Sequence, residues 1–335
     1  MVDVSNPFYQ EDLESTFSYM EELLGDKKSN ILVVGATGLI GSFLVDAFIS
    51  YSEKFGKEIQ IYAMGRDYQR LERRFNYCKS NQLHLMEQDV QQRINTNHRY
   101  DFIFHLASNA DPNTYKLFPY ETITTNVLGT KNVIDYAIEN RNAKVLFTST
   151  MEVYGEIQKE SLKEEYYGAI DFNQIRAGYP ESKRTSELMY RSAVEEYGIH
   201  AVITRLGYIY GPTMTDGDNK IIAEFIRKKK TEEEIILRSS GSQRRTYCYV
   251  ADAVAGMLLV LAKGQNGQAY NVADENSEVT LRELAEIFGA TTGTQAEEKK
   301  EVFDTVLEVT KIKKLGWGSR ISIQEGINRT LKCMK

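Results

Sequence analysis

The sequence predicts an α/β fold, in which helices cover both faces of a parallel sheet. Short strand-like runs alternate with helix-length segments over the first two thirds of the 335-residue chain. Most of these runs are almost entirely apolar, as is typical of strands buried on both faces. A glycine-rich turn directly follows the first run, where doubly wound sheets bind phosphates. We therefore expect a Rossmann-type doubly wound parallel sheet with a smaller C-terminal substrate-binding lobe.

The strands of this sheet are expected at six apolar runs. In chain order they are NILVVGA (30–36), EIQIYAM (58–64), QLHLMEQD (82–89), DFIFHLA (101–107), KVLFTST (144–150) and HAVITRL (200–206). After the first run, Ile40, Leu44 and Phe48 mark one face of a helix. Strands and helices that alternate in this way build a parallel sheet.

One docking helix is expected before the sheet, over residues 9–25. Its apolar face would consist of Leu13, Phe17, Met20 and Leu24, which are spaced at helical intervals among acidic residues. We assign residues 1–28 to this N-terminal helical extension.

The rest of the chain divides into a dinucleotide-binding domain and a substrate-binding lobe. The alternation of strands and helices becomes irregular after Gly211-Pro212, and the chain returns to the core near CYVADAVAGMLLVL at 248–261. The expected domain spans 29–210 and is completed by about 246–275. The expected lobe comprises 211–245 and 276–335.

Composition and charge exclude several classes of partner. A net charge of -6 gives no general attraction to nucleic acid or to an anionic membrane. The longest apolar stretch, residues 253–262, is too short to span a bilayer. The three cysteines have no metal-ligand spacing, so no metal is expected and we interpret them as free thiols. The acidic N-terminus has no signal-peptide pattern, and a cytoplasmic location is expected.

The sequence ILVVGATGLIG carries a phosphate-binding turn. Gly35, Gly38 and Gly41 lie between the first strand and the first helix. Glycines allow a tight turn and a close approach of the backbone to a pyrophosphate, and the helix N-terminus adds N–H donors. The spacing is G-x-x-G-x-x-G, and its position between a strand and an amphipathic helix favours a dinucleotide site over an ordinary turn.

The tip of the second strand bears on the choice between NAD and NADP. An acidic residue there would bond the ribose hydroxyl of NAD, whereas an arginine tolerates the 2′-phosphate of NADP. The tip reads Gly65-Arg66, with Asp67 one step later, so charge alone favours NADP unless Arg66 is simply a surface residue. Asp89, at the end of the third strand, is either an adenine contact or a cap of the next turn.

A catalytic pair is predicted on a later helix. Tyr179 and Lys183 are four residues apart, and therefore on one helical face, with Pro180 in the first turn. An ammonium beside a phenol favours the phenolate, so we expect a lowered pKa of Tyr179 and general-base action on a sugar hydroxyl. The fifth strand ends in hydroxyl residues and a carboxylate, within the sequence TSTMEVYG (148–155).

Taken together, these motifs resemble the extended short-chain dehydrogenase/reductase family of NAD-dependent nucleotide-sugar epimerases and dehydratases. The resemblance runs from about residue 30 to about residue 285. It is carried by HLASNADPNTYKLFPYETITTNVLGTKNV, TSTMEVYGE, YYGAIDFNQIRAGYPESKR, YIYGPTM and GSQRRTYCYVAD. Within the family, the segment YYGAIDFNQIRAGY before the catalytic helix is most similar to UDP-glucuronate decarboxylases, also called UDP-xylose synthases.

The resemblance implies a role for each matching residue. Thr150 would bond the sugar 4-hydroxyl beside Tyr179, and Glu152 would act at C5 or during decarboxylation. The implied substrate contacts are Tyr115, Arg245 and Tyr208, and His105 would pack beside the cofactor. The implied cofactor contacts are Gly35, Thr37, Gly38, Leu39, Ile40, Gly41, Arg66, Asp89, Val90, Ala107 and Lys183. Glu152 as a turn cap, Arg245 as a surface residue and Tyr115 as core packing are the structural alternatives.

The implied reaction passes through a 4-keto sugar. Tyr179 takes the 4-hydroxyl proton while hydride leaves C4 for the nicotinamide. If C6 is a carboxylate, the product is a β-keto acid that loses carbon dioxide, and hydride then returns to C4.

Three positions depart from the decarboxylase pattern. Tyr208 stands where an asparagine usually contacts the substrate phosphate, and Thr213 where an arginine usually helps to hold the nucleotide. Met151 occupies a position at which decarboxylases carry a small hydroxyl residue. In 4,6-dehydratases it is an aspartate that protonates the departing hydroxyl, and a thioether has no proton to give.

Several functions therefore remain open at the sequence level. A UDP-glucuronate decarboxylase-like enzyme is the first choice, and a nucleotide-sugar 4-epimerase is the alternative. A 4,6-dehydratase is disfavoured by Met151, and a non-catalytic dinucleotide-binding protein by the presence of both Tyr179 and Lys183. The expected partners are a nucleotide sugar and NAD, with NADP as the alternative. The resemblance also implies a homodimer formed by helices near 119–140 and 179–197.

Overall fold

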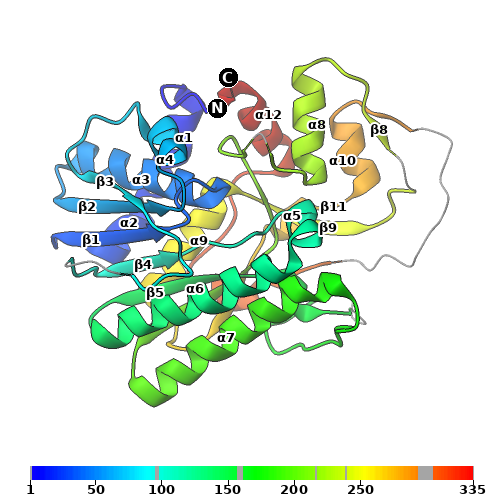
Figure 1. The fold of residues 1–335 in the computed structure, drawn as a ribbon. Coiled ribbons are helices and arrows are strands. Elements are labelled where there is room, and N and C mark those ends of the chain that lie inside the picture. The colour runs from blue at the N-terminus through cyan, green and yellow to red at the C-terminus, as the bar shows by residue number, and fades with distance from the viewer. Residues whose placement is uncertain are drawn as a thin grey trace.

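A seven-stranded parallel sheet forms the centre of the protein (Figure 1). The computed structural model describes residues 2–94, 98–156, 161–215, 217–237, 240–292 and 305–334. The strand order is β10-β6-β5-β4-β1-β2-β3. The strands are β1 (Ser29–Val34), β2 (Ile59–Gly65), β3 (Leu83–Glu87), β4 (Phe102–His105), β5 (Lys144–Thr150), β6 (His200–Leu206) and β10 (Ala269–Val272). All six predicted strands are confirmed, and β10 adds a seventh beside β6.

Helices cover both faces of this sheet, which confirms the predicted doubly wound class. Alternate residues of each strand face opposite layers. Ile31 and Val33 of β1 pack in one core with α3 (Leu39–Phe55) and α9 (Val250–Lys263). Leu32 and Val34 pack in the other core with α6 (Pro119–Glu139) and α7 (Gly178–Tyr197). Figure 1 shows α6 and α7 side by side along one face.

The N-terminal extension consists of two helices, so the prediction of one helix over 9–25 is wrong. Helix α1 (Pro7–Glu14) and helix α2 (Phe17–Leu24) meet at Ser15 and Thr16. The hydroxyls of these two residues donate to the carbonyls of Asp12 and Leu13, at 2.7 and 2.6 Å. Such bonds compete with the helical backbone and interrupt it. The apolar residues expected to dock are nevertheless buried, namely Leu13, Phe17, Met20 and Leu24.

A smaller mixed sheet lies in the C-terminal part. Its strands are β7 (Tyr208–Tyr210), β9 (Arg244–Tyr249) and β11 (Glu278–Thr280), with β7 parallel and β11 antiparallel to β9. A second pair joins β8 (Ile236–Leu237) to β12 (Thr291–Thr292). The helices of this part are α8 (Ile221–Lys230), α10 (Leu281–Ile287) and α12 (Ile323–Cys333), whereas α11 (Thr310–Lys313) packs against β10 of the main sheet. That this region binds substrate, and the domain boundaries themselves, stay predictions; residues 293–304 lie outside the described residues.

Several short elements connect the longer strands and helices. They are α4 (Tyr68–Phe75), α5 (Pro112–Leu117) and the 3-10 turns η1 (Met151–Tyr154), η2 (Ile175–Ala177) and η3 (Glu275–Ser277). Within the described residues, no helix is long and apolar enough to span a membrane.

Candidate active site

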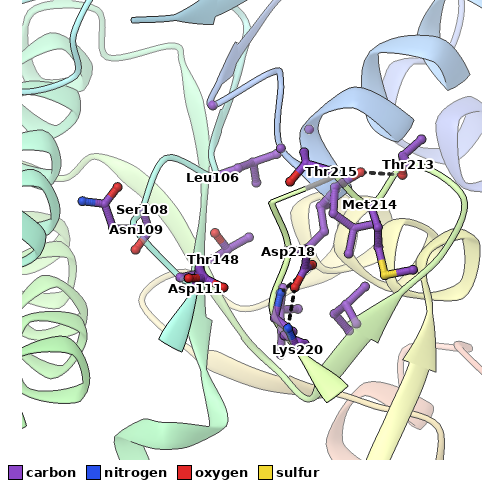
Figure 2. Close-up of a pocket in the computed structure, with 18 of the residues that line it drawn as sticks. Leu106, Ser108, Asn109, Asp111, Thr148, Thr213, Met214, Thr215, Asp218 and Lys220 are labelled. Atoms are coloured by element: carbon purple, nitrogen blue, oxygen red, sulfur yellow. Dashed lines mark hydrogen bonds and ion pairs between the residues drawn. The ribbon is translucent and has the colours of Figure 1, made fainter. Parts of the chain in front are cut away.

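A cavity of about 730 Å³ opens at the carboxyl edge of the central strands. This volume is in the range of small-molecule and cofactor sites, which lie outside this edge in doubly wound sheets. Figure 2 shows Leu106, Ser108 and Asn109, which follow β4, on one side of the cavity. Thr213, Met214 and Thr215, which follow β7, form the other side.

The glycine turn lines this cavity, and a side chain would have different consequences at each of its three glycines. Gly35 has a φ of +92°, and a Cβ there would lie 2.8 Å from the backbone N of Ala107. A Cβ on Gly41 would lie 2.3 Å from the Gly35 carbonyl oxygen. Packing within the protein therefore requires these two glycines. A Cβ on Gly38 would meet nothing closer than 3.5 Å, so the protein itself leaves room for a side chain there.

Gly38 is also the N-cap of α3, and no side chain caps that helix end. The backbone N–H groups of the first turn of α3 therefore have no side-chain acceptor, and such a helix N-terminus favours the binding of an anion. The predicted cofactor contacts Thr37, Leu39 and Ile40 line the same cavity. This turn fits a dinucleotide pyrophosphate on its own geometry.

Tyr179 and Lys183 reach the cavity from the first turns of α7, and both are buried. The Lys183 ammonium donates to the backbone carbonyl of Thr148, at 2.8 Å. Thr150 ends β5 near the Tyr179 phenol, and acts to lower the pKa of that phenol. Strand β5 and helix α7 thus bring together three of the four predicted catalytic groups.

The expected lowering of the Tyr179 pKa is not what the structure shows. Burial raises the pKa of Tyr179 above its usual range, and the negative charge of Glu152 adds to the increase, whereas Thr150 opposes it. Burial also lowers the pKa of Lys183 to about 7. Spacing along the helix predicted the pair correctly but carried no information about desolvation, which dominates both groups.

Glu152, the fourth predicted catalytic group, begins the turn after β5 and lines the cavity. Its Oε1 accepts a hydrogen bond from the Tyr115 hydroxyl at 3.3 Å. Its Oε2 lies 3.2 Å from the Arg176 guanidinium. Burial raises the pKa of Glu152, and Arg176, Tyr115 and Arg245 each act in the opposite direction. The half-buried carboxylate therefore lies between a buried tyrosine hydroxyl and an exposed arginine, and does not merely cap a turn.

Tyr115 stacks on the catalytic tyrosine. The rings of Tyr115 and Tyr179 are 4.9 Å apart between centroids, with 13° between their planes. Tyr115 is 3% exposed and does not itself line the cavity. It holds the ring of Tyr179 and the carboxylate of Glu152 in one arrangement, and its predicted contact with the sugar stays a prediction.

Arg176 is a site residue that the sequence analysis missed. It lies in η2, three residues before Tyr179, and its guanidinium is also 5.7 Å from the Tyr115 ring centroid. The sequence RAGY contained the signal, because a residue in the turn before α7 must lie near the first turn of that helix.

Arg245 and Tyr208 form a stacked pair at the smaller sheet. The Arg245 guanidinium lies 4.7 Å from the Tyr208 ring centroid, and its Nη2 donates to Gln243 at 3.3 Å. Tyr208 lines the cavity, whereas Arg245 lies outside its lining. Their roles toward a substrate stay predictions.

Two predicted cofactor contacts after β3 are directed elsewhere. Oδ1 of Asp89 accepts from the backbone N of Gln91 at 2.9 Å, so it caps a turn. Val90 is 6% exposed and packs in the core against α6. Neither lines the cavity, and contact of either residue with adenine stays a prediction.

The residues at the end of β4 and just after it pack against the glycine turn. The backbone of Ala107 packs against Gly35, as the close Cβ approach shows. Nδ1 of His105 hydrogen-bonds the hydroxyl of Tyr190 at 2.8 Å, and burial lowers the pKa of His105 to about 3. His105 is therefore a neutral, buried residue behind the cavity, and Leu106 and Ser108 form the lining at this point.

Two polar side chains of the lining point to a polar ligand. Oγ of Ser149 and Nδ2 of Asn109 are buried and have no hydrogen-bond partner among the described residues. Buried polar atoms are normally satisfied, so these two fit a ligand that supplies the missing partners. The described residues contain no group of three or more metal-ligating side chains.

Comparisons with known proteins agree with this geometry. A family model described as the NAD dependent epimerase/dehydratase family matches residues 31–273. UDP-glucuronic acid decarboxylase 6 of Arabidopsis thaliana is 31% identical over 304 residues, which cover 89% of this chain and 86% of that protein.

Solved structures of similar fold include an epimerase and a dehydratase. The UDP-glucose 4-epimerase of Thermotoga maritima, solved with UDP-glucose, has a TM-score of 0.76 and 26% identity, over 90% of this chain and 97% of that one. The dTDP-glucose 4,6-dehydratase of Streptomyces venezuelae, solved with NAD bound, has a TM-score of 0.77 and 25% identity, over 90% and 96%.

Proposed function

This chain belongs to the NAD-dependent epimerase/dehydratase family of nucleotide-sugar-modifying enzymes, and we propose that it decarboxylates UDP-glucuronate through a transient 4-keto sugar. The observation that carries the proposal is the convergence of Tyr179, Lys183, Thr150 and Glu152 at one cavity that the glycine turn also lines. The similarity to the decarboxylase of Arabidopsis thaliana over 89% of the chain supports the choice of reaction.

A nicotinamide dinucleotide would bind along this cavity. The open start of α3 behind Gly38 would hold its pyrophosphate, and Lys183 would reach its nicotinamide ribose. When bound, this cofactor accepts a hydride and later returns it. NAD is the cofactor of the family.

Tyr179 would act as the general base on the sugar 4-hydroxyl. Thr150 would orient that hydroxyl, because it lines the cavity together with Tyr179. The raised pKa of Tyr179 must fall for this step. The charged form of Lys183 acts in that direction, as does the positive charge of an oxidised nicotinamide.

The groups around Glu152 would serve the second step. A ketone at C4 makes the C6 carboxylate a β-keto acid, so the C5–C6 bond breaks, carbon dioxide leaves, and the electron pair forms an enolate. A proton then returns to C5, for which Glu152 is placed. Arg176 and Arg245, which lower the pKa of Glu152, supply positive charge at the same end.

A 4-epimerase is the second candidate. The similarity to the Thermotoga maritima 4-epimerase favours it, and the same four catalytic groups would serve. Met151 is 6% exposed and lines the cavity, so an apolar group stands where decarboxylases carry a hydroxyl. A 4,6-dehydratase is disfavoured, because the Met151 thioether cannot protonate a departing 6-hydroxyl.

Return of the hydride to the same sugar is tested with UDP-glucuronate carrying deuterium at C4. We expect the deuterium to remain at C4 of the UDP-pentose product.

We expect Tyr179→Phe to lower the rate by about 10²–10⁴, the usual contribution of a general base. The control Tyr197→Phe removes an exposed hydroxyl from the far end of the same helix and should leave the rate unchanged. Loss of the deuterium, or full activity of Tyr179→Phe, would contradict the mechanism.

We also propose a homodimer built on α6 and α7. These helices pack together through the bond from Thr130 to Ser186, at 2.9 Å. They leave large apolar side chains exposed, among them Ile123, Leu128 and Leu188. Burial of these side chains against a second copy would stabilise the pair.

A further inference from the structure

Four arginines from one short segment line the end of the cavity at β2. They are Arg66, Arg70, Arg73 and Arg74, from the tip of β2 and from α4. This end lies beside the glycine turn, because the backbone N of Gly35 donates to the Met64 carbonyl at 3.0 Å. Arg74 also reaches across to the first half of α3, where it pairs with Asp46. In the proposed cofactor orientation, this end faces the adenosine ribose.

The acids of this region are already engaged. Oδ1 of Asp67 caps α4 by accepting from the backbone N of Arg70, at 3.0 Å. Glu121 pairs with Arg66 at 2.8 Å, and Glu87 accepts from the backbone N of Tyr68 at 3.3 Å. Each carboxylate in this set thus already has a partner within the protein.

The arginines, in contrast, are only partly neutralised. Arg66, Arg70 and Arg73 are exposed. Arg70 and Arg73 have no ion-pair partner among the described residues, and the acids of the described cavity lining come from other segments, namely Asp111, Glu152 and Asp218. An additional anion at the ribose would thus meet guanidinium groups, which suit phosphate because of their planar set of donors.

We propose that this arginine segment, residues 66–74, forms a subsite for a 2′-phosphate, so that the chain binds NADP more tightly than NAD. The inference rests on the proposed dinucleotide site and departs from the NAD dependence of the family. Arg66 and Arg70 would hold the phosphate, with Arg73 adding charge. Arg74 would keep α4 in place through its pair with Asp46.

Isothermal titration of the purified protein with NADP and with NAD tests this subsite, with adenosine 2′,5′-bisphosphate and ADP as smaller probes. We expect NADP to bind at least about tenfold more tightly, since a hydrogen bond to a charged group contributes about 1.5–3 kcal/mol. The variants Arg66→Ala and Arg70→Ala should each lose most of this preference while binding NAD as before. Arg93→Ala, which removes an exposed arginine paired with Glu139 outside the cavity lining, is the matched control and should change neither affinity.

The outcomes separate this inference from the proposed function. Binding of NAD with equal or greater affinity than NADP would overturn the 2′-phosphate subsite and leave the dinucleotide site intact. A preference for NADP that survives both arginine substitutions would overturn the assignment to this segment. Failure of the wild-type protein to bind either dinucleotide would overturn both the subsite and the proposed function.

Discussion

At the scale of single residues, Glu152 shows how burial and local charge act against each other. Desolvation raises its pKa, and Arg176, Tyr115 and Arg245 act to lower it, with desolvation dominant. Its protonated form, which must deliver the proton to C5, therefore persists to a higher pH than that of an ordinary glutamate.

The pH dependence of kcat/KM should follow this carboxyl group. Since Glu152 acts as the proton donor and its pKa is raised, kcat/KM should fall as the pH rises through an apparent pKa above the ordinary value of 4.5. Glu152→Gln should lower kcat by about 10²-fold or more and remove this inflection. Glu195→Gln neutralises an exposed carboxylate on α7 and should leave the profile unchanged. A fall of kcat/KM over the same pH range that persists in Glu152→Gln would assign the titration to another group.

The sequence was sufficient for those site residues whose position follows from a strand end or a helical repeat. Thr150, Glu152, Tyr179 and Lys183 all lie where the motifs placed them. Arg176 could not be assigned a role, because its partner Glu152 is distant in the chain and only the fold brings them together. The direction of the Tyr179 pKa was also wrong, since spacing does not report burial.

At the scale of elements, the turn between β1 and α3 contains one glycine that packing requires and one glycine that packing does not require. Gly41 is fixed by the Gly35 carbonyl, whereas Gly38 has room for a methyl group within the protein. The two positions therefore offer a direct test of what each glycine does.

Gly38→Ala should change ligand binding, whereas Gly41→Ala should change the stability of the fold. We expect Gly38→Ala to keep the wild-type Tm and to weaken dinucleotide binding about tenfold or more, because the methyl group blocks charge-assisted bonds worth about 1.5–3 kcal/mol. Gly41→Ala should destabilise the fold by about 1–3 kcal/mol through overpacking. Gly318→Ala, with nothing within 4 Å of its Cβ, is the control for both measurements. Unchanged dinucleotide affinity in Gly38→Ala would show that no ligand approaches this glycine.

Helices and strands were predictable where the pattern of apolar residues along the sequence is strong. Strands such as β1, β4 and β5 are buried on both faces, so each contains a continuous apolar run, namely ILVV, FIF and VLF. The break between α1 and α2 was missed because Ser15 and Thr16 end the first helix through side-chain bonds that leave the apolar spacing intact. Strand β10 (AYNV) was missed because Asn271 interrupts its apolar residues, whereas the equally short β4 (FIFH) begins with three apolar residues in a row.

At the scale of the whole molecule, the helix pair α6 and α7 connects assembly with the active site. Helix α7 carries Tyr179 and Lys183 on its buried side and Leu188 on its exposed side. A second copy bound there would hold the catalytic helix against the sheet from outside.

The protein should therefore be a dimer in solution. Light scattering after size-exclusion chromatography should give twice the chain mass of 38.3 kDa. The double substitution Leu128→Arg and Leu188→Arg should produce monomers, because two charges would have to be buried in the interface. Ile236→Arg changes an exposed apolar residue of β8 and should leave the dimer intact. A dimer that tolerates both arginines would place the interface elsewhere.

Incubation of the purified protein with UDP-glucuronate carrying carbon-13 at C6 tests the proposed reaction most directly. With saturating NAD and NADP both present, we expect labelled carbon dioxide and a UDP-pentose in equal amounts, without net accumulation of reduced cofactor. Absence of labelled carbon dioxide, together with inversion at C4 of a nucleotide sugar, would contradict decarboxylation and identify the chain as a 4-epimerase.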